Sequence, residues 1–230
     1  MHFGDSQIEA DRITSYFRNE LQKKHSGGGA GLFSVVQVTR KLSVKKNISD
    51  NWIRYAGFGK KDTAIMHKKY GCLLAFSKFS PINNTNDSIY SAWININKPN
   101  MSYRTARKYN NLKIFYGNTD FKTSVQVIAD SVIISQDSLL KGESIKIETY
   151  HFNQTPKQIQ IKFLGKQSPD IYGLSLESDK GVIIDNIPLR GASGTEFSKQ
   201  DRTTLKQMFT FLEPDLLILE FGGNTIPYVK

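Results

Sequence analysis

Cysteine and long apolar runs are scarce in this sequence of 230 residues. Cys72 is its one cysteine, which excludes an internal disulfide and leaves the redox compartment open. No apolar run approaches the roughly 18 to 20 residues that a membrane-spanning helix needs, so we expect no segment to cross a bilayer. The opening MHFGDSQ has neither a basic region nor an apolar core, and an export signal would therefore lie outside this sequence. With 39% hydrophobic and 23% charged residues, the composition is typical of a globular protein and excludes simple disorder.

Acidic residues are also few, and the deficit is local. The formal net charge is +10. Between Arg40 and Asp170 the chain has 21 basic against 9 acidic residues, a balance of +12, whereas the rest holds 10 basic against 12 acidic, a balance of −2. This asymmetry indicates a two-part architecture. The excess lysines have two interpretations that the sequence leaves equal: charges that keep a β-rich domain soluble and its edges unpaired, or a surface for an anionic partner.

The hydrophobic pattern changes at similar places. Residues Gln7–Lys24 have the spacing of a helix with Ser6 as its N-cap, and the glycine-rich segment 26–31 ends that helix. From about Arg40 to Leu176, short β-prone runs alternate with turn-rich clusters without a long helix, which predicts an antiparallel β-sandwich. The β-prone runs are Leu73–Phe76, Ile89–Ile96, Leu112–Tyr116, Ser124–Ile128, Val132–Ile134, Ser144–Tyr150 and Gln158–Phe163.

The last part of the chain returns to a pattern of alternating strands and helices. We predict a strand at Gly181–Ile187, a helix at Phe197–Leu212 with Ser198 as N-cap, and a buried parallel strand at Asp215–Phe221. The predicted fold class is α/β, with a three-layer, flavodoxin-like parallel sheet that is incomplete here and an inserted antiparallel β-sandwich domain. The predicted bounds are 1–39 and 177–230 for the α/β domain and 40–176 for the insert.

Three short motifs follow predicted strands of the α/β part. Gly4-Asp5-Ser6 places a hydroxyl where a strand leads into a helix, whose N-terminal amides stabilise negative charge, although a simple N-cap is the commoner role of such a serine. In the stretch GASGT, Gly191 lets its N–H approach a ligand closely, although a plain strand-to-helix turn is equally compatible. Gly222-Gly223-Asn224 ends on an amide that can donate to an oxyanion, or on an ordinary turn asparagine.

In this order the three motifs resemble the blocks of the SGNH (GDSL-like) hydrolase superfamily. The resemblance implies that Ser6 is the nucleophile and that Gly191 and Asn224 form the oxyanion hole. A β-sandwich between the first two blocks is similar to bacterial envelope esterases that carry an inserted carbohydrate-binding-like module, peptidoglycan O-acetylesterases in particular. The implied function is a serine esterase that removes acyl groups, with acetyl expected, from a polysaccharide or peptidoglycan. It implies no cofactor and no metal, and a periplasmic or cell-envelope location.

The general base that this mechanism needs is missing from the sequence. In the superfamily it comes from a C-terminal Asp-x-x-His block, and none of the four histidines follows an aspartate by three residues: His2, His25, His67 and His151. The resemblance therefore implies a fragment of a larger hydrolase, short at both ends and with little or no turnover.

Two other functions stay open. The alternative is a non-catalytic carbohydrate-binding protein that uses the basic sandwich. Aromatic residues that offer stacking faces favour it, although such residues are more often core: Trp52, Tyr55, Tyr90, Trp93, Tyr103 and Tyr109. Nucleic-acid binding has only the basic stretch 103–109 in its favour and no recognised motif. The predicted partner is therefore an acylated polysaccharide or peptidoglycan, with no nucleic acid and no membrane span.

Overall fold

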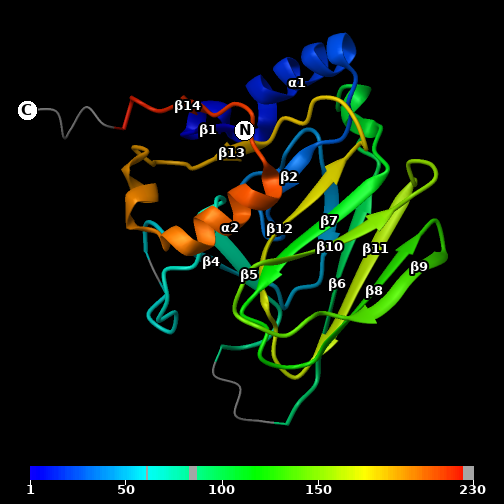
Figure 1. Cartoon of the computed structure of the whole chain (residues 1–230), viewed down its shortest axis with the longest axis vertical. Helices are drawn as coiled ribbons and strands as arrows, with labels where there is room; N and C mark the ends of the chain where they lie inside the picture. Colours follow the sequence, from blue (N-terminus) through cyan, green and yellow to red (C-terminus); the bar gives the residue numbers. More distant parts are fainter. Residues whose placement is uncertain (61, 83–86, 225–230) are drawn as a thin grey trace, which may run out of the picture.

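Two antiparallel sheets that pack face to face make up most of the chain (Figure 1). The computed structural model describes residues 1–60, 62–82 and 87–224. The first sheet has six strands, in the order β10-β7-β12-β5-β4 with β2 also paired to β12. Their bounds are Gly31–Phe33 (β2), Ile53–Ala56 (β4), Ala75–Lys78 (β5), Asn111–Gly117 (β7), Lys146–His151 (β10) and Asp170–Glu177 (β12). The second sheet has five strands, in the order β3-β6-β11-β8-β9. Their bounds are Lys45–Ile48 (β3), Tyr90–Asn97 (β6), Thr123–Ala129 (β8), Val132–Ser138 (β9) and Gln158–Gly165 (β11).

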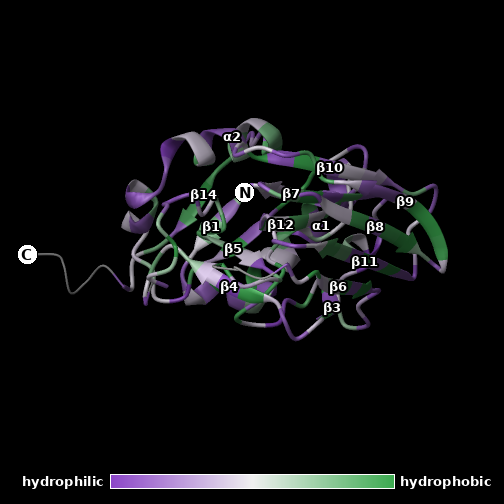
Figure 2. Ribbon diagram, turned by 90° about the horizontal axis from the view of Figure 1, so that it is seen from below, coloured by the Kyte–Doolittle hydropathy of each residue, from purple (hydrophilic) through white to green (hydrophobic). Residues whose placement is uncertain are grey.

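The main hydrophobic core lies between these sheets. Along β11 exposed or half-buried residues alternate with buried ones, so that Ile159, Ile161 and Phe163 point into the core. Figure 2 shows hydrophobic residues along the strands of the five-stranded sheet, to which β11 belongs. In contrast, β12 is buried along its whole length because a second core covers the other face of its sheet. The outer face of the five-stranded sheet is exposed and carries polar residues together with Trp93 and Leu164.

A small parallel sheet and two helices cover the far side of the six-stranded sheet. This sheet has the order β13-β1-β14, and each of its strands has three residues: His2–Gly4 (β1), Asn186–Pro188 (β13) and Ile218–Glu220 (β14). The helices are α1 (Arg12–His25) and α2 (Arg202–Leu212), and short 3-10 turns lie at Ser6–Asp11 (η1), Thr105–Arg107 (η2) and Thr195–Lys199 (η3). Neither described α-helix is long and apolar enough to span a membrane.

The predicted fold class is wrong. Within the described ranges the chain is mostly antiparallel β-sandwich, and its parallel strands form no flavodoxin-like three-layer sheet. The segment DLLILEF was predicted to be a buried strand because it is apolar, yet β14 is an edge strand with exposed Ile218 and Leu219. Apolar composition alone does not bury a strand when no neighbour covers its faces.

The β-prone runs are confirmed, since each of the seven overlaps an observed strand. The strands β3, β4 and β12 had no separate prediction. Gly31–Phe33, which precedes the predicted insert, pairs with β12 and so joins the six-stranded sheet. The predicted domain bounds themselves stay a prediction.

The first helix begins later than predicted, and its apolar side chains lie on its exposed face. Asp5, rather than Ser6, caps the first turn, because its Oδ1 accepts a hydrogen bond from the Gln7 N–H at 2.9 Å. Ala10 and Asp11 then adopt left-handed backbone angles, which separate η1 from α1. The face of α1 that packs inward is polar and includes Arg18, whereas Phe17 stays exposed on the outer face. In the second helix, α2, the N-cap is Asp201 and not the predicted Ser198.

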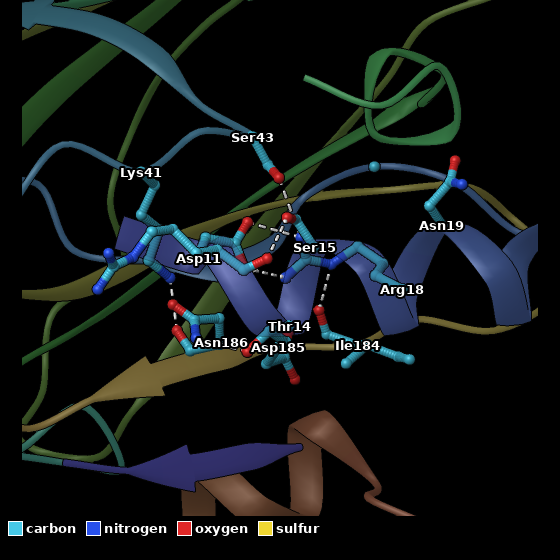
Figure 3. A network of polar contacts seen from close by, with 12 residues as sticks. Asp11, Thr14, Ser15, Arg18, Asn19, Lys41, Ser43, Ile184, Asp185 and Asn186 are labelled. Carbon is cyan, nitrogen blue, oxygen red and sulfur yellow. Dashed lines mark hydrogen bonds and ion pairs between the residues drawn. The ribbon is translucent and has the colours of Figure 1, made fainter. Parts of the chain in front are cut away.

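A buried polar network holds α1 in this orientation (Figure 3). The Arg18 guanidinium forms two hydrogen bonds to the Asp11 carboxylate, at 2.7 and 3.0 Å, and both side chains are almost fully buried. Arg18 also donates to Ser43 Oγ and to the carbonyl oxygen of Ile184. The network therefore joins α1 to the start of the sandwich and to the segment that returns from it.

Candidate functional site

The outer face of the five-stranded sheet carries a row of long polar side chains around one tryptophan. The antiparallel register places one residue from each of four neighbouring strands side by side. These residues are Trp93 (β6), Lys162 (β11), Gln126 (β8) and Gln136 (β9). Because successive side chains of a strand point to opposite faces, the chain neighbours of Trp93, Lys162 and Gln126 lie in the core. We call this surface the Trp93 face.

Side-chain amides continue the Trp93 face in the next row. Asn95 on β6 lies opposite Gln160 on β11, and Gln160 Nε2 donates to Asn95 Oδ1 at 3.0 Å. In the first row, Gln126 Nε2 donates to Gln136 Oε1 at 2.8 Å. Each amide has two donor hydrogens and an acceptor oxygen, so one mutual bond fixes its orientation and leaves further capacity for a ligand.

Trp93 is held in place through its backbone. Its N–H donates to Ser49 Oγ at 3.1 Å, and its carbonyl oxygen accepts from the Ser49 N–H at 3.0 Å and from Trp52 Nε1 at 3.2 Å. The residue itself is 37% exposed. An exposed aromatic residue on a rigid strand provides a ready contact surface at low entropic cost.

Around Trp93 the sheet face has a shallow hollow of about 350 Å³. Leu164 and Ser124 line it together with the residues of the first row. Among the described residues Lys162 has no ion-pair partner, so its charge is available at the same place. The face therefore combines an aromatic ring, oriented amides and a cation, which can contact the apolar side, the hydroxyls and an acidic group of one ligand.

Of the aromatic residues singled out in the sequence, only some are on the surface. Trp52, Tyr55 and Tyr109 are buried, whereas Trp93 and Tyr103 are exposed. Tyr103 lies elsewhere, against Tyr16 of α1. The amides were not among the predicted site residues, although the alternation of polar and apolar residues in YSAWININ and QIQIKFLG indicates them.

The residues predicted for an esterase lie at the opposite end, near the small parallel sheet. Ser6 is exposed at the start of η1, and Gly191 has a positive φ of 78° with open space where a side chain would be. Asn224 Nδ2 donates to Asp5 Oδ2 at 3.3 Å and to the Ala192 carbonyl oxygen at 3.1 Å. Asn224 thus contacts Asp5, which precedes Ser6, and Ala192, which follows Gly191. No described contact joins Ser6 to Gly191 or to Asn224.

Three of the four histidines contact residues other than Ser6, and the fourth, His25, is exposed at the end of α1. His2 is buried and bonds to Thr14 and Glu220, His67 lies 3.3 Å from Asp170, and His151 contacts Asn111. Nor does any cluster of three or more histidine, cysteine or acidic residues suit a metal ion in the part of the chain that the structure describes.

The basic stretch 103–109 forms no continuous binding surface. Tyr109 is buried, and Arg107 donates to the carbonyl oxygens of Asn100 and Ser102. Its guanidinium therefore holds the turn around η2 together.

No family model and no curated protein matches the chain. Several solved structures are similar to parts of the chain. The K1 cleaved adhesin domain of Lys-gingipain from Porphyromonas gingivalis W83 is 10% identical, with a TM-score of 0.40, over 65% of this chain and 98% of that domain. A family 6 carbohydrate-binding module is 6% identical, with a TM-score of 0.35, over 65% and 94%. The family 32 module of C. perfringens NanJ, solved with galactose, is 12% identical, with a TM-score of 0.32, over 59% and 94%.

These findings correct the resemblance on which the esterase prediction depended. The structures just named are carbohydrate-binding modules and an adhesin domain, and none is an SGNH hydrolase. The predicted membership of that superfamily and the predicted serine esterase are wrong, because both depended on a flavodoxin-like three-layer sheet and the described residues form an antiparallel β-sandwich instead. The assignment of Ser6, Gly191 and Asn224 as site residues is untested and stays a prediction.

Proposed function

We propose that this protein is a non-catalytic carbohydrate-binding protein and that the Trp93 face is its glycan-binding surface. One observation supports this above all others: an exposed tryptophan, anchored through its backbone, lies in a hollow beside amides that hydrogen bonds already orient. A pyranose ring has an apolar face of C–H groups and a rim of hydroxyls. Indole and side-chain amides are the groups that complement these two parts.

The shape of the face favours a polymer over a single sugar. The hollow is shallow, and the amide rows continue across neighbouring strands. A small ligand is usually enclosed in a cleft, whereas a chain of sugars can lie along an open surface. The free charge of Lys162 and the basic character of the sandwich favour an anionic polysaccharide. A cell-envelope polymer such as peptidoglycan, and a location there, belong to this proposal.

The test is a pull-down of the protein on insoluble peptidoglycan and on neutral xylan, at low and high salt. Trp93→Ala should weaken binding by about 10-fold or more, the usual effect of truncating an aromatic hot spot. Tyr103→Ala is the matched control, because Tyr103 is similarly exposed, at 41%, but lies beside α1. Binding to neither polymer, or equal binding by wild type and Trp93→Ala, contradicts the proposal.

Salt separates the contribution of charge from that of stacking. Binding to peptidoglycan that decreases at high salt, and decreases less in Lys162→Gln, would place the charge of Lys162 in the interface. Equal binding to xylan at both salt concentrations would assign the affinity to Trp93 and the amides.

A further inference from the structure

A second hollow, remote from the Trp93 face, lies between β4, the segment 34–41 and β13. We call it the β4 cleft. Its volume is about 320 Å³, within the range of small-molecule sites. Its wall includes Arg54 of β4, Gln37 and Lys41 of the segment, and Arg190 just after β13.

Positive charge exceeds negative charge in this cleft. Four cationic side chains line it, and Glu9 is the only acidic residue among its described lining residues: the cations are Lys41, Arg54, Lys60 and Arg190. Glu9 is already satisfied. Arg190 donates three hydrogen bonds to its carboxylate, at 2.6 to 3.0 Å, and Thr39 Oγ1 donates a fourth at 2.6 Å. Three cations therefore remain without a carboxylate in the cleft.

Lys41 is fixed by the backbone rather than by an acid. Its Nζ donates to the carbonyl oxygen of Asn186 at 2.5 Å (Figure 3). It also donates to the carbonyl oxygen of Leu32 at 3.2 Å. Burial lowers the pKa of Lys41 to about 8, with a further lowering by the nearby Arg18 charge, although Asp11 and Asp185 oppose this. Lys41 thus contributes positive potential at neutral pH without moving.

Arg54 is the decisive residue. Its guanidinium has no hydrogen-bond or ion-pair partner among the described residues, and burial lowers its pKa. Arginine keeps its proton in proteins, so this group remains a half-buried cation without a counter-charge, which is costly. Its planar fork of N–H donors matches the two oxygens of a carboxylate or a phosphate.

Two further features of the cleft suit an organic anion. Gln37 Nε2 is buried and has no hydrogen-bond partner in the described structure, which leaves a donor for a ligand hydroxyl or oxyanion. Leu73 and Phe58 contribute apolar surface to the same cleft. The combination provides a charged end and an apolar side for a ligand of roughly monosaccharide size.

We propose that the β4 cleft binds a small anionic ligand through a carboxylate or phosphate group held by Arg54, with Gln37 as a second donor. This site is separate from the Trp93 face and does not depend on the proposed function. An acidic sugar, such as a hexuronate or a sugar phosphate, has the chemistry that the cleft can hold. The carboxylate and the phosphate are distinguished by the choice of probe.

The test is calorimetric titration of the full chain with glucuronate, glucose 6-phosphate, inorganic phosphate and glucose. At least one of the anions should bind, and glucose should bind at least 10-fold more weakly. Arg54→Gln should weaken anion binding on the order of 10- to 100-fold, the effect of losing one charge-assisted hydrogen-bond pair. Arg104→Gln, an exposed arginine of the η2 region, should change nothing. Trp93→Ala should also leave this binding unchanged, which would distinguish binding in the β4 cleft from binding on the Trp93 face.

Thermal unfolding provides a second measurement. Saturating anion should raise the melting temperature of the wild type and of Arg104→Gln but not that of Arg54→Gln. Arg54→Lys keeps the positive charge but loses the planar N–H donors of the guanidinium, so its anion affinity should be intermediate. This variant replaces Arg54→Gln in the test if Arg54→Gln folds poorly. Absence of binding by all three anions, or unchanged affinity in folded Arg54→Gln, would overturn the proposal.

Discussion

Trp52 donates a hydrogen bond from its buried indole to the carbonyl oxygen of Trp93, at 3.2 Å, and so connects the core of the sandwich to its outer face. The Trp52 ring makes edge contacts with Phe79 and Phe163 inside the core. Because Trp93 receives this bond on its backbone, the orientation of its exposed ring depends on how the core packs. The geometry of the Trp93 face therefore depends on the packing of the sandwich core.

Trp52→Phe should reduce both stability and glycan affinity. The substitution keeps an aromatic ring but loses the indole donor and leaves a small cavity, at a cost of about 1–3 kcal/mol in free energy of unfolding. Binding should weaken by several-fold because Trp93 loses one of its anchors. Urea unfolding and pull-down on peptidoglycan measure the two effects. A destabilised Trp52→Phe protein that binds like the wild type would show that Trp52 does not position the face.

The strands could be predicted from the sequence, whereas their arrangement in layers could not. Alternation in QIQIKFLG gives both the strand β11 and the polar face that Gln160 and Lys162 share. The same rule fails for β12, where Asp170 and Ser175 are buried because helix α2 and the parallel sheet cover that face as well. Which face of a strand is covered depends on elements distant in sequence, and local periodicity contains no information about them.

The three glycine-containing motifs show a second limit of sequence patterns. Gly4-Asp5-Ser6 contains the cap of η1, a local function that Asp5 performs with one hydrogen bond to Gln7. Short turns of small residues occur wherever a strand meets a helix, so their order along a chain supports a family only weakly. The amides of the Trp93 face come from four strands, and only the register of the sheet brings them together.

Asp170→Asn should strongly destabilise the protein. The carboxylate is fully buried at the start of β12, where it contacts Lys78 at 2.8 Å, His67 at 3.3 Å and Asn118 at 2.5 Å. Removing it leaves the Lys78 ammonium buried without an anion, which costs about 3–5 kcal/mol. Chemical denaturation measures the loss. Asp87→Asn is the control, because the Asp87–Lys166 pair is on the surface and should contribute little.

The same carboxylate should make stability dependent on acid. Burial raises the pKa of Asp170, but the hydrogen bond from His67 and the charge of Lys78 lower it more, so that it lies below the ordinary 3.8. The unfolded chain therefore takes up the proton first as the pH falls. The contribution of Asp170 is complete well above pH 4 and is lost as the pH falls through its folded pKa. Acid unfolding curves of wild type and Asp170→Asn should converge at low pH, and a constant difference would refute this account.

Lys41 predicts a change of the same sign in alkaline solution. Its folded pKa of about 8 is below the ordinary 10.5, mainly because of burial. Between these values the unfolded chain holds the proton that the folded chain has lost, so stability from this group rises with pH, by up to about 1.4 kcal/mol per pH unit. The free energy of unfolding of the wild type should gain on that of Lys41→Met from pH 8 to pH 10. Parallel profiles would show that Lys41 titrates normally.

Helix α1 packs its polar face inward and exposes its apolar face. Substitutions on the apolar face should therefore cost less stability than substitutions on the polar face. Phe17 is 51% exposed, so Phe17→Ser removes little buried apolar surface and should change the free energy of unfolding by no more than about 0.5 kcal/mol. Arg18 is fully buried, and Arg18→Met keeps the length and the apolar stem of the side chain but leaves the Asp11 carboxylate unpaired, at a cost of about 3–5 kcal/mol. The double variant Asp11→Asn with Arg18→Met should recover part of this loss, because it removes both charges together. If Phe17→Ser were instead the more damaging change, the apolar stripe of α1 would have to face the core, as its sequence alone suggests.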